Sequence, residues 1–156
     1  MEHKSHKVHP SVPRAVILLP VVVAMHIAEK WFAGFIDWAR CSLGVVIPPE
    51  RFLADTAAGK ALFAFGAIVA FREPRLAWIG VSLTALVCLN AFVQAGLSLA
   101  VGVYSPGTVK GLLLYLPLSF VQFQSAAAHI SRTTIIGAIL LGFRIHAGCG
   151  CPALPY

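Results

Sequence analysis

The side chains best suited to chemistry lie on one face of a predicted helix in the first apolar run. His26, Glu29, Lys30 and Asp37 follow helical spacing there, which places them on the same side of a helix. An ionisable side chain inside hydrocarbon is costly and therefore marks a candidate functional site. Because a histidine and a glutamate one turn apart can transfer a proton, we consider His26 as a catalytic acid or base and Glu29 as the residue that orients it.

Simpler roles for these residues stay open. Lys30 can extend its ammonium group to the lipid headgroups, and Glu29 lies close enough to the end of the run to approach them. His26 is too central in the run for that. Its alternative role is a hydrogen bond between two helices.

Later apolar runs contribute further polar side chains. Asn90 and Gln94 are one turn apart in the third run, and we expect them, with Tyr104, to bind and position a ligand or substrate. Hydrogen bonding that only packs the helices together is the alternative. The fourth run carries a polar stripe at helical spacing, consisting of Tyr115, Ser119, Gln122 and His129. Because three helices then have a polar face, the pattern predicts an internal polar cavity.

Asp55 and Lys60 are candidate ligand-binding residues near the start of the second apolar run. Asp55 is expected to mark the point where this helix enters the membrane. Lys60 lies about one turn further in, since a helical turn takes 3.6 residues. We expect it either to neutralise Glu29 across the bundle or to extend to the surface.

No metal site is predicted, and the cofactor stays unknown. Zinc requires three or four His, Cys or carboxylate ligands. His26 and Glu29 have only His129 or Asp55 to add to such a set. A haem held by two histidines is disfavoured as well, because His129 lies at a predicted helix end whereas His26 is central.

The composition places these residues in a lipid bilayer. Of 156 residues, 58% are hydrophobic and 12% are charged, whereas a soluble domain contains roughly 25% charged residues. A soluble fold and a disordered chain are therefore both excluded. The formal net charge is +6. Because the basic residues lie in short polar gaps between apolar runs, they favour contact with lipid headgroups, and no nucleic acid partner is expected.

The chain is expected to be an all-α, polytopic transmembrane helix bundle of about five spans. We expect a basic polar tail at 1–14, a transmembrane helical domain at 15–147 and a C-terminal tail at 148–156. The predicted spans are 15–36, 56–71, 76–103, 108–128 and a short last one at 133–147. We expect a loop between the first two, because Pro48 and Pro49 remove two backbone donors.

Lysine and arginine are slightly more frequent in the polar gaps on the N-terminal side of this predicted bundle, six against four. Cytoplasmic loops of membrane proteins carry an excess of these residues. We therefore expect an integral membrane protein with a cytoplasmic N-terminus, in the inner membrane of a bacterium.

Four short motifs resemble those of the HXXEE family of membrane proteins. HIAEK at 26–30 is similar to the family's signature helix, and PERF at 49–52 resembles the segment before its second helix. NAFVQ at 90–94 stands where the family has NxxxH, and YSPG at 104–107 is similar to YxPG. The resemblance extends over about residues 15–125, most of the chain. It implies a small polytopic helical membrane protein with a polar site inside the membrane.

The chain departs from the family pattern at two positions. Lys30 replaces the second glutamate of HXXEE, and Gln94 replaces the histidine of NxxxH. Both changes remove a potential metal ligand or proton carrier. The alternatives are an internal ion pair of Lys30 with Glu29 or Asp55, and hydrogen bonding by Gln94. The residues to which the resemblance assigns a place in the site are His26, Glu29, Asn90, Tyr104, Pro106 and Gly107.

Three functions are compatible with these observations. The degenerate motifs favour a membrane-embedded binding or accessory protein, whose polar side chains bind a lipid-like ligand or another membrane protein subunit. The second function is a small membrane-embedded enzyme that performs acid/base chemistry on a lipid or isoprenoid substrate. The third is an oligomeric transporter or proton conduit. Small residues permit close helix packing, so self-association is expected under each of the three.

Overall fold

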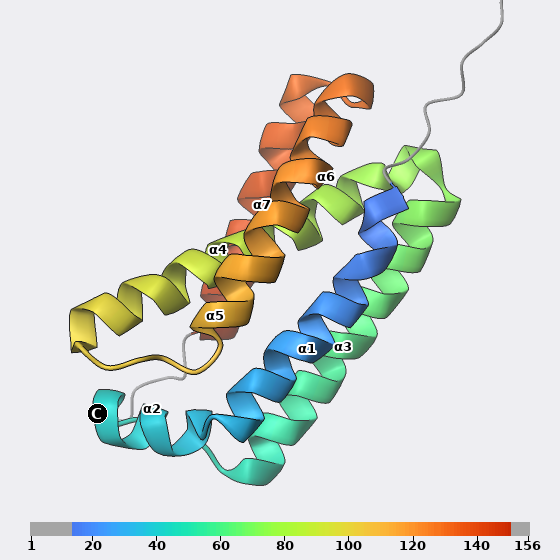
Figure 1. Cartoon of the computed structure of the whole chain (residues 1–156). Helices are drawn as coiled ribbons and strands as arrows, with labels where there is room; N and C mark the ends of the chain where they lie inside the picture. Colours follow the sequence, from blue (N-terminus) through green and yellow to red (C-terminus); the bar gives the residue numbers. More distant parts are fainter. Residues whose placement is uncertain (1–13, 151–156) are drawn as a thin grey trace, which may run out of the picture.

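The computed structural model describes residues 14–150, which form helices and short connections (Figure 1). The elements are the 3-10 helix η1 (Arg14–Leu18), α1 (Leu19–Phe32), α2 (Phe35–Leu43), α3 (Pro49–Arg72), the 3-10 helix η2 (Pro74–Leu76), α4 (Ala77–Val101), α5 (Thr108–Lys110), the π-helix η3 (Gly111–Tyr115), α6 (Leu116–His129) and α7 (Arg132–Gly150). No strand occurs within residues 14–150, so the predicted all-α class is confirmed. The two predicted tails lie largely outside the described residues, and α7 continues past the predicted domain boundary at 147.

Four helical stretches are long and apolar enough to cross a membrane. These stretches are Ala15–Phe32, Pro49–Arg72, Pro74–Val101 and Thr108–His129. They correspond to the first four predicted spans. Among the described residues α7 does not belong to this group, and it carries Arg132 and Arg144. A fifth crossing therefore stays a prediction.

The first helix ends earlier than its apolar pattern predicts. α1 stops at Phe32, and Gly34 adopts φ +71°. Glycine tolerates this left-handed conformation because it has no Cβ, which makes it a common residue just after a helix end. The chain then turns away from α1 and forms α2, inside a region predicted to be largely loop (Figure 1).

The second long helix begins earlier than predicted. α3 starts at Pro49 rather than at residue 56. A proline at the first helical position costs no hydrogen bond, because the N–H it lacks would have no partner inside the helix. The Pro48–Pro49 pair therefore starts the helix instead of preventing it, and Asp55 falls within its first two turns.

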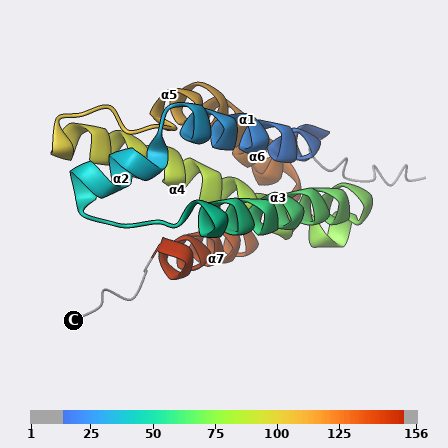
Figure 2. The same cartoon turned by 90° about the horizontal axis from the view of Figure 1, so that it is seen from below.

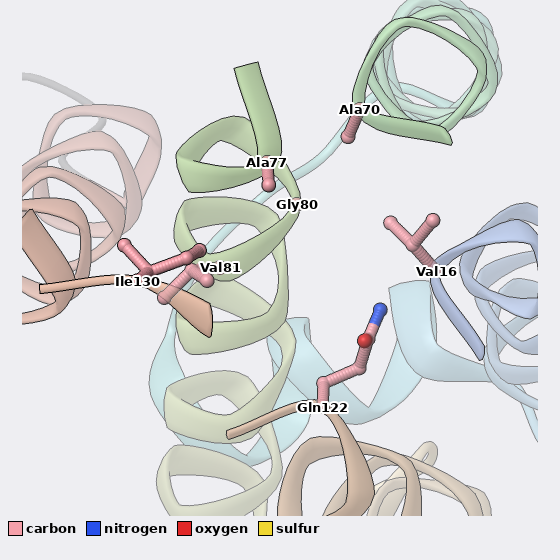
Figure 3. Close-up of a pocket in the computed structure, with 7 residues that line it drawn as sticks. All are labelled: Val16, Ala70, Ala77, Gly80, Val81, Gln122 and Ile130. Carbon is pink, nitrogen blue, oxygen red and sulfur yellow. The ribbon is translucent and has the colours of Figure 1, made fainter. Parts of the chain in front are cut away.

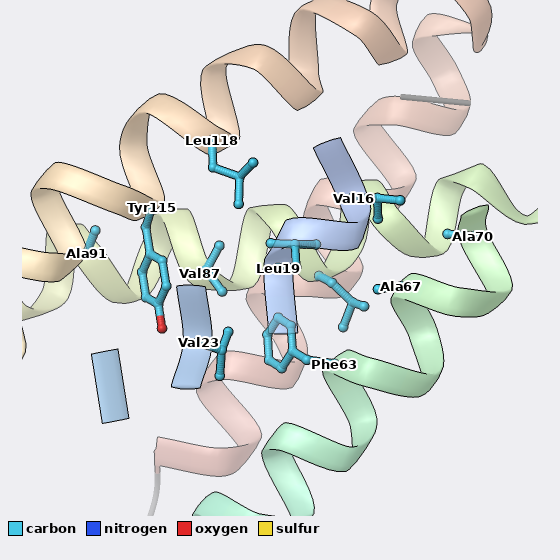
Figure 4. Packing of buried hydrophobic residues seen from close by; sticks show 11 residues of the cluster. Val16, Leu19, Val23, Phe63, Ala67, Ala70, Val87, Ala91, Tyr115 and Leu118 are labelled. Atoms are coloured by element: carbon cyan, nitrogen blue, oxygen red, sulfur yellow. The ribbon is translucent and has the colours of Figure 1, made fainter. Parts of the chain in front are cut away.

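The central helix of the bundle is α4, which packs against α3, α6, α7 and η3 (Figures 1 and 2). The main core cluster joins the start of the chain to α3, α4, η3 and α6 (Figure 4). Its buried members are Val16, Leu19, Val23, Phe63, Ala67, Ala70, Leu83, Val87, Ala91, Tyr115 and Leu118. On the other side of α4, a Cβ at Gly142 of α7 would lie 2.5 Å from the carbonyl oxygen of Ser82. Close backbone approach at small residues is typical of helix packing in membranes.

Candidate functional site

His26 lies in the interior of the bundle, where α1 faces α4. Its side chain is 3% exposed, and its Nε2 lies 3.1 Å from Nδ2 of Asn90. In this amide orientation Asn90 donates, so Nε2 accepts and the ring proton resides on Nδ1. Nδ1 is buried and has no hydrogen-bond partner among the side chains and backbone groups that the structure describes. The ring also contacts Tyr115, with 4.8 Å between the ring centroids.

Glu29 connects α1 to the segment that follows α4. Its Oε1 accepts a hydrogen bond from the hydroxyl of Tyr104, and its Oε2 accepts one from the backbone N–H of Lys110 at 2.9 Å. Both carboxylate oxygens therefore accept a hydrogen bond from the segment at 104–110. Hydrogen bonds to an ionised acceptor are stronger than those between neutral groups. Glu29 thus holds segment 104–110 against α1.

Tyr104 is suited to remain the donor in this bond. Partial burial raises the pKa of its hydroxyl above 10.0, and the hydrogen bond to Glu29 and the charge of Glu29 raise it further. Each of these causes disfavours the phenolate, which would place a second negative charge beside a carboxylate. The hydroxyl therefore keeps its proton at neutral pH.

The turn at 104–107 is anchored to α4 by Ser105, which is fully buried. Its hydroxyl donates to Oε1 of Gln94, and its backbone N–H donates to the hydroxyl of Ser98 at 2.9 Å. The hydroxyl of Thr108 donates to the carbonyl of Ser105 at 2.7 Å. A buried turn must satisfy its backbone groups within the protein, and these bonds do so.

Gly107 brings this turn into direct contact with α1. It adopts φ +105°, and a Cβ at this position would lie 2.7 Å from Cε1 of His26 and 3.0 Å from Cε of Lys30. Both the backbone conformation and the space available therefore require glycine. The turn therefore packs directly against the imidazole ring of His26.

The side chains of His26, Glu29, Asn90, Gln94, Tyr104 and Ser105 form what we call the polar cluster. Lys30 lies at its edge, beside a hollow that we call the aromatic hollow. The hollow has a volume of about 130 Å³ and is lined mainly by Lys30, Trp31, Phe35, Ile36, Asp37 and Phe52. Nζ of Lys30 lies 4.5 Å from the centroid of the Phe35 ring, which is within the range of a cation–π contact. Phe52 packs against Trp31 and Phe35, with centroid distances of 6.0 and 5.9 Å. The aromatic hollow thus has apolar walls and one cation.

The structure brings together five of the seven predicted site residues around the turn at 104–107. These five residues are His26, Glu29, Asn90, Gln94 and Tyr104. Asp55 and Lys60 lie outside this group. Asp55 is exposed and its carboxylate lies 3.6 Å from Arg51 on the same helix, and Lys60 is also exposed. Within residues 14–150 the two ion pairs are Arg51–Asp55 and Arg40–Asp37, so the described residues contain no pair between Lys60 and Glu29.

The predicted polar stripe of the fourth span is only partly buried. Ser119 and Gln122 are buried, whereas His129 is exposed at the end of α6. Gln122 points into a second, small hollow of about 10 Å³ (Figure 3), roughly the space of one water molecule. The other residues around that hollow are Val16, Ala70, Ala77, Gly80, Val81 and Ile130. The predicted internal polar cavity therefore stays a prediction.

Sequence reasoning missed two contributors to the site. The backbone N–H of Lys110 leaves no signal in a sequence, because every residue except proline has one. Ser105 belongs to the YSPG segment, but its contact with Gln94 depends on how the turn folds back onto α4. Among residues 14–146, whose side chains the structure describes, no group of three or more His, Cys, Asp or Glu side chains is arranged to hold a metal ion.

Fold and site together define a class of protein. Four apolar helices indicate a membrane protein, and its polar motifs meet around one turn between the third and fourth spans. A family model described as "Protein of unknown function with HXXEE motif" matches residues 17–122, and the chain belongs to this family. The predicted family is thereby confirmed. Neither a curated protein nor a solved structure matches the chain.

Proposed function

We propose that this protein is a binding or accessory component of a membrane assembly, and that its polar site presents a preformed surface to a ligand or partner. The observation that carries this proposal is the use of Glu29. Both of its carboxylate oxygens hold the segment at 104–110, whereas the ring of His26 is bonded to Asn90. Glu29 therefore fixes a turn instead of orienting the histidine. This role suits a rigid binding surface better than an acid/base pair.

The shape of the site supports the same proposal. The polar side chains around the turn form hydrogen bonds in pairs. The aromatic hollow lies beside them and has room for a ligand. Binding sites typically combine mostly apolar walls with a few polar groups that fix orientation. A lipid-like ligand or the helix of another subunit meets both requirements.

The test is native mass spectrometry of the full chain, extracted gently from the membrane in which it is made. We expect either a retained lipid-like molecule or a defined set of copurifying protein chains, including further copies of this chain. A protein that is monomeric and carries nothing, in several mild detergents, contradicts the proposal.

A membrane-embedded acid/base enzyme is the second candidate, and one observation favours it. Nδ1 of His26 is buried without a partner among the described residues, and such a group in a reactive site can exchange a proton with a substrate. Turnover of extracted membrane lipids by wild-type protein, lost in a folded His26→Ala variant, supports the enzyme. Unchanged lipids with both proteins favour the binding component.

The orientation of the protein is also a proposal. With a cytoplasmic N-terminus, α2 and the aromatic hollow face the outside of the bacterial inner membrane. Cys41 on α2 is exposed, so a thiol reagent that cannot cross membranes labels it from outside in a variant whose other three cysteines are replaced by serine. Labelling that occurs only after the cells are broken reverses the orientation.

A further inference from the structure

We infer that the aromatic hollow binds the phosphate headgroup of an anionic phospholipid, with Lys30 as the residue that recognises the charge. This inference rests on the proposed binding function and adds the chemical class of the ligand. It places the ligand beside the polar cluster instead of within it.

Lys30 contributes a positive charge to the aromatic hollow. The ion pairs within residues 14–150 are Arg40–Asp37 and Arg51–Asp55, so the ammonium of Lys30 has no carboxylate within ion-pair distance in that part of the chain. Asp37 also lines the hollow, but Arg40 donates to its carboxylate at 2.9 Å. Lys30 is therefore the cation in the hollow that is available to an anion. A lysine ammonium binds phosphate as a compact point charge.

The size and position of the aromatic hollow suit a lipid headgroup. A cavity of about 130 Å³ is smaller than the 300–1,000 Å³ of typical drug-sized ligand pockets, so it accommodates a headgroup but not a whole lipid. Lys30 is near the C-terminal end of the span Ala15–Phe32, which is where headgroups lie. Phe32 is 86% exposed and Trp31 is 45% exposed beside it. Acyl chains can lie against these apolar side chains while the headgroup enters the hollow.

The change in the family motif also favours an anionic ligand. Lys30 occupies the position of the second glutamate in HXXEE. A glutamate there would add a negative charge beside Glu29 and would repel an anionic headgroup. The substitution therefore gives this chain a site of opposite charge at the same position. No hydrogen bond of the polar cluster in the described residues uses the Lys30 side chain, so the cluster is preserved.

The experiment measures lipid retention by native mass spectrometry on the purified full chain. The protein is delipidated and mixed with equal amounts of dioleoyl phosphatidylglycerol and dioleoyl phosphatidylcholine, which differ in net charge but share the same acyl chains. We expect the wild type to retain phosphatidylglycerol in preference. Lys30→Gln should reduce that preference by about fivefold, roughly the effect of one basic residue near an anionic membrane surface.

Lys60→Gln is the matched control, because Lys60 is an exposed lysine on a neighbouring span. It should leave the preference unchanged, whereas Lys30→Glu should abolish it and Lys30→Arg should largely retain it. An equal loss in Lys60→Gln shows that net charge alone is responsible and overturns the inference. A preference that survives Lys30→Gln overturns it as well.

The outcomes also separate this inference from the proposed function. A wild-type protein that shows no preference for phosphatidylglycerol, but retains another molecule or defined protein chains, refutes the headgroup site and leaves the binding function standing. A wild-type protein that retains nothing refutes both. The lipid preference of the wild type is measured without any variant. A variant that fails to fold therefore does not prevent the test.

Discussion

Replacing Gly107 by alanine should loosen the contact between the turn at 104–107 and α1. The new Cβ would lie 2.7 Å from Cε1 of His26 and 3.0 Å from Cε of Lys30. Overpacking a tight interior typically costs about 1–3 kcal/mol. A non-glycine residue at a left-handed backbone position costs about 1–2 kcal/mol more, and φ at Gly107 is +105°. The free energy of unfolding should therefore fall by about 2–5 kcal/mol, as the sum of these two effects.

Two other glycines separate the steric contribution from the backbone contribution. Gly102 adopts φ +71° but a Cβ there meets no atom within 4 Å, so Gly102→Ala should show only the backbone cost of about 1–2 kcal/mol. Gly96 lies within α4, and a Cβ there also meets no atom within 4 Å. Gly96→Ala should be neutral or stabilising by roughly 0.5–1 kcal/mol, the usual helical advantage of alanine over glycine.

The assay is unfolding in mixed micelles, with the denaturing detergent increased stepwise and tryptophan fluorescence as the signal. Trp31 lines the aromatic hollow beside Lys30, which approaches Gly107, and Trp38 stacks on Phe35 of the same hollow, so their emission reports on this region. Trp78 on α4 is replaced by phenylalanine in every protein compared, so that it does not contribute to the signal. We expect Gly96→Ala to be the most stable variant, Gly102→Ala to be less stable and Gly107→Ala to be the least stable. If Gly107→Ala is as stable as Gly96→Ala, the turn does not pack against His26 as described and the geometry of the site is wrong.

Three further predictions concern other contacts. Asn90→Ala leaves both ring nitrogens of His26 without a partner in the described part of the chain and should destabilise the protein by about 1–3 kcal/mol in the same assay; an unchanged stability contradicts this contact. The raised pKa of Tyr104 favours its protonated form in the folded state, so this residue contributes stability that is complete below pH 10 and is lost as the pH rises through its folded pKa. The stability difference between wild type and Tyr104→Phe should therefore shrink above pH 10, and a constant difference refutes the assignment. Gly142→Ala should cost about 1–3 kcal/mol, because its Cβ would overlap a backbone carbonyl of α4; Gly137→Ala on the same helix, whose Cβ meets nothing within 4 Å, should not.

Long apolar runs made the class and the first four spans predictable, because each run is close to the length that a bilayer requires. The ends of the helices were less predictable. The apolar pattern continues through Phe35 and Ile36, so only the positive φ of Gly34 reveals that α1 has ended. The Pro48–Pro49 pair predicts a loop, but Pro49 stands at the first helical position, where a proline starts a helix. In both cases the meaning of a glycine or a proline depends on its position in the element.

The site was predictable as a group of residues but not as a set of bonds. Helical spacing placed His26 and Glu29 on one face and Asn90 and Gln94 on another. It did not show that Asn90 would bond to His26 while Glu29 would bond to Tyr104. Those pairings depend on where the chain between the third and fourth spans folds back, which only tertiary packing determines. Asp55 is predicted to mark the start of its helix, whereas α3 begins at Pro49; its role in ligand binding stays a prediction.

Lys30 departs from the HXXEE motif, and Gln94 is the second position at which the sequence resemblance indicates a departure; the two residues have different surroundings in the structure. Gln94 still accepts a hydrogen bond from Ser105, and an acceptor nitrogen of histidine is able to fill the same role. Lys30, by contrast, reverses the charge at the edge of the aromatic hollow while the bonds of His26 and Glu29 remain in place. Gln94 is therefore part of the anchor of the turn, and Lys30 gives the neighbouring hollow a positive charge. The hydrogen bonds of His26, Glu29 and Gln94 thus fix the turn, while Lys30 is left to act on the neighbouring hollow, where we propose that an anionic headgroup binds.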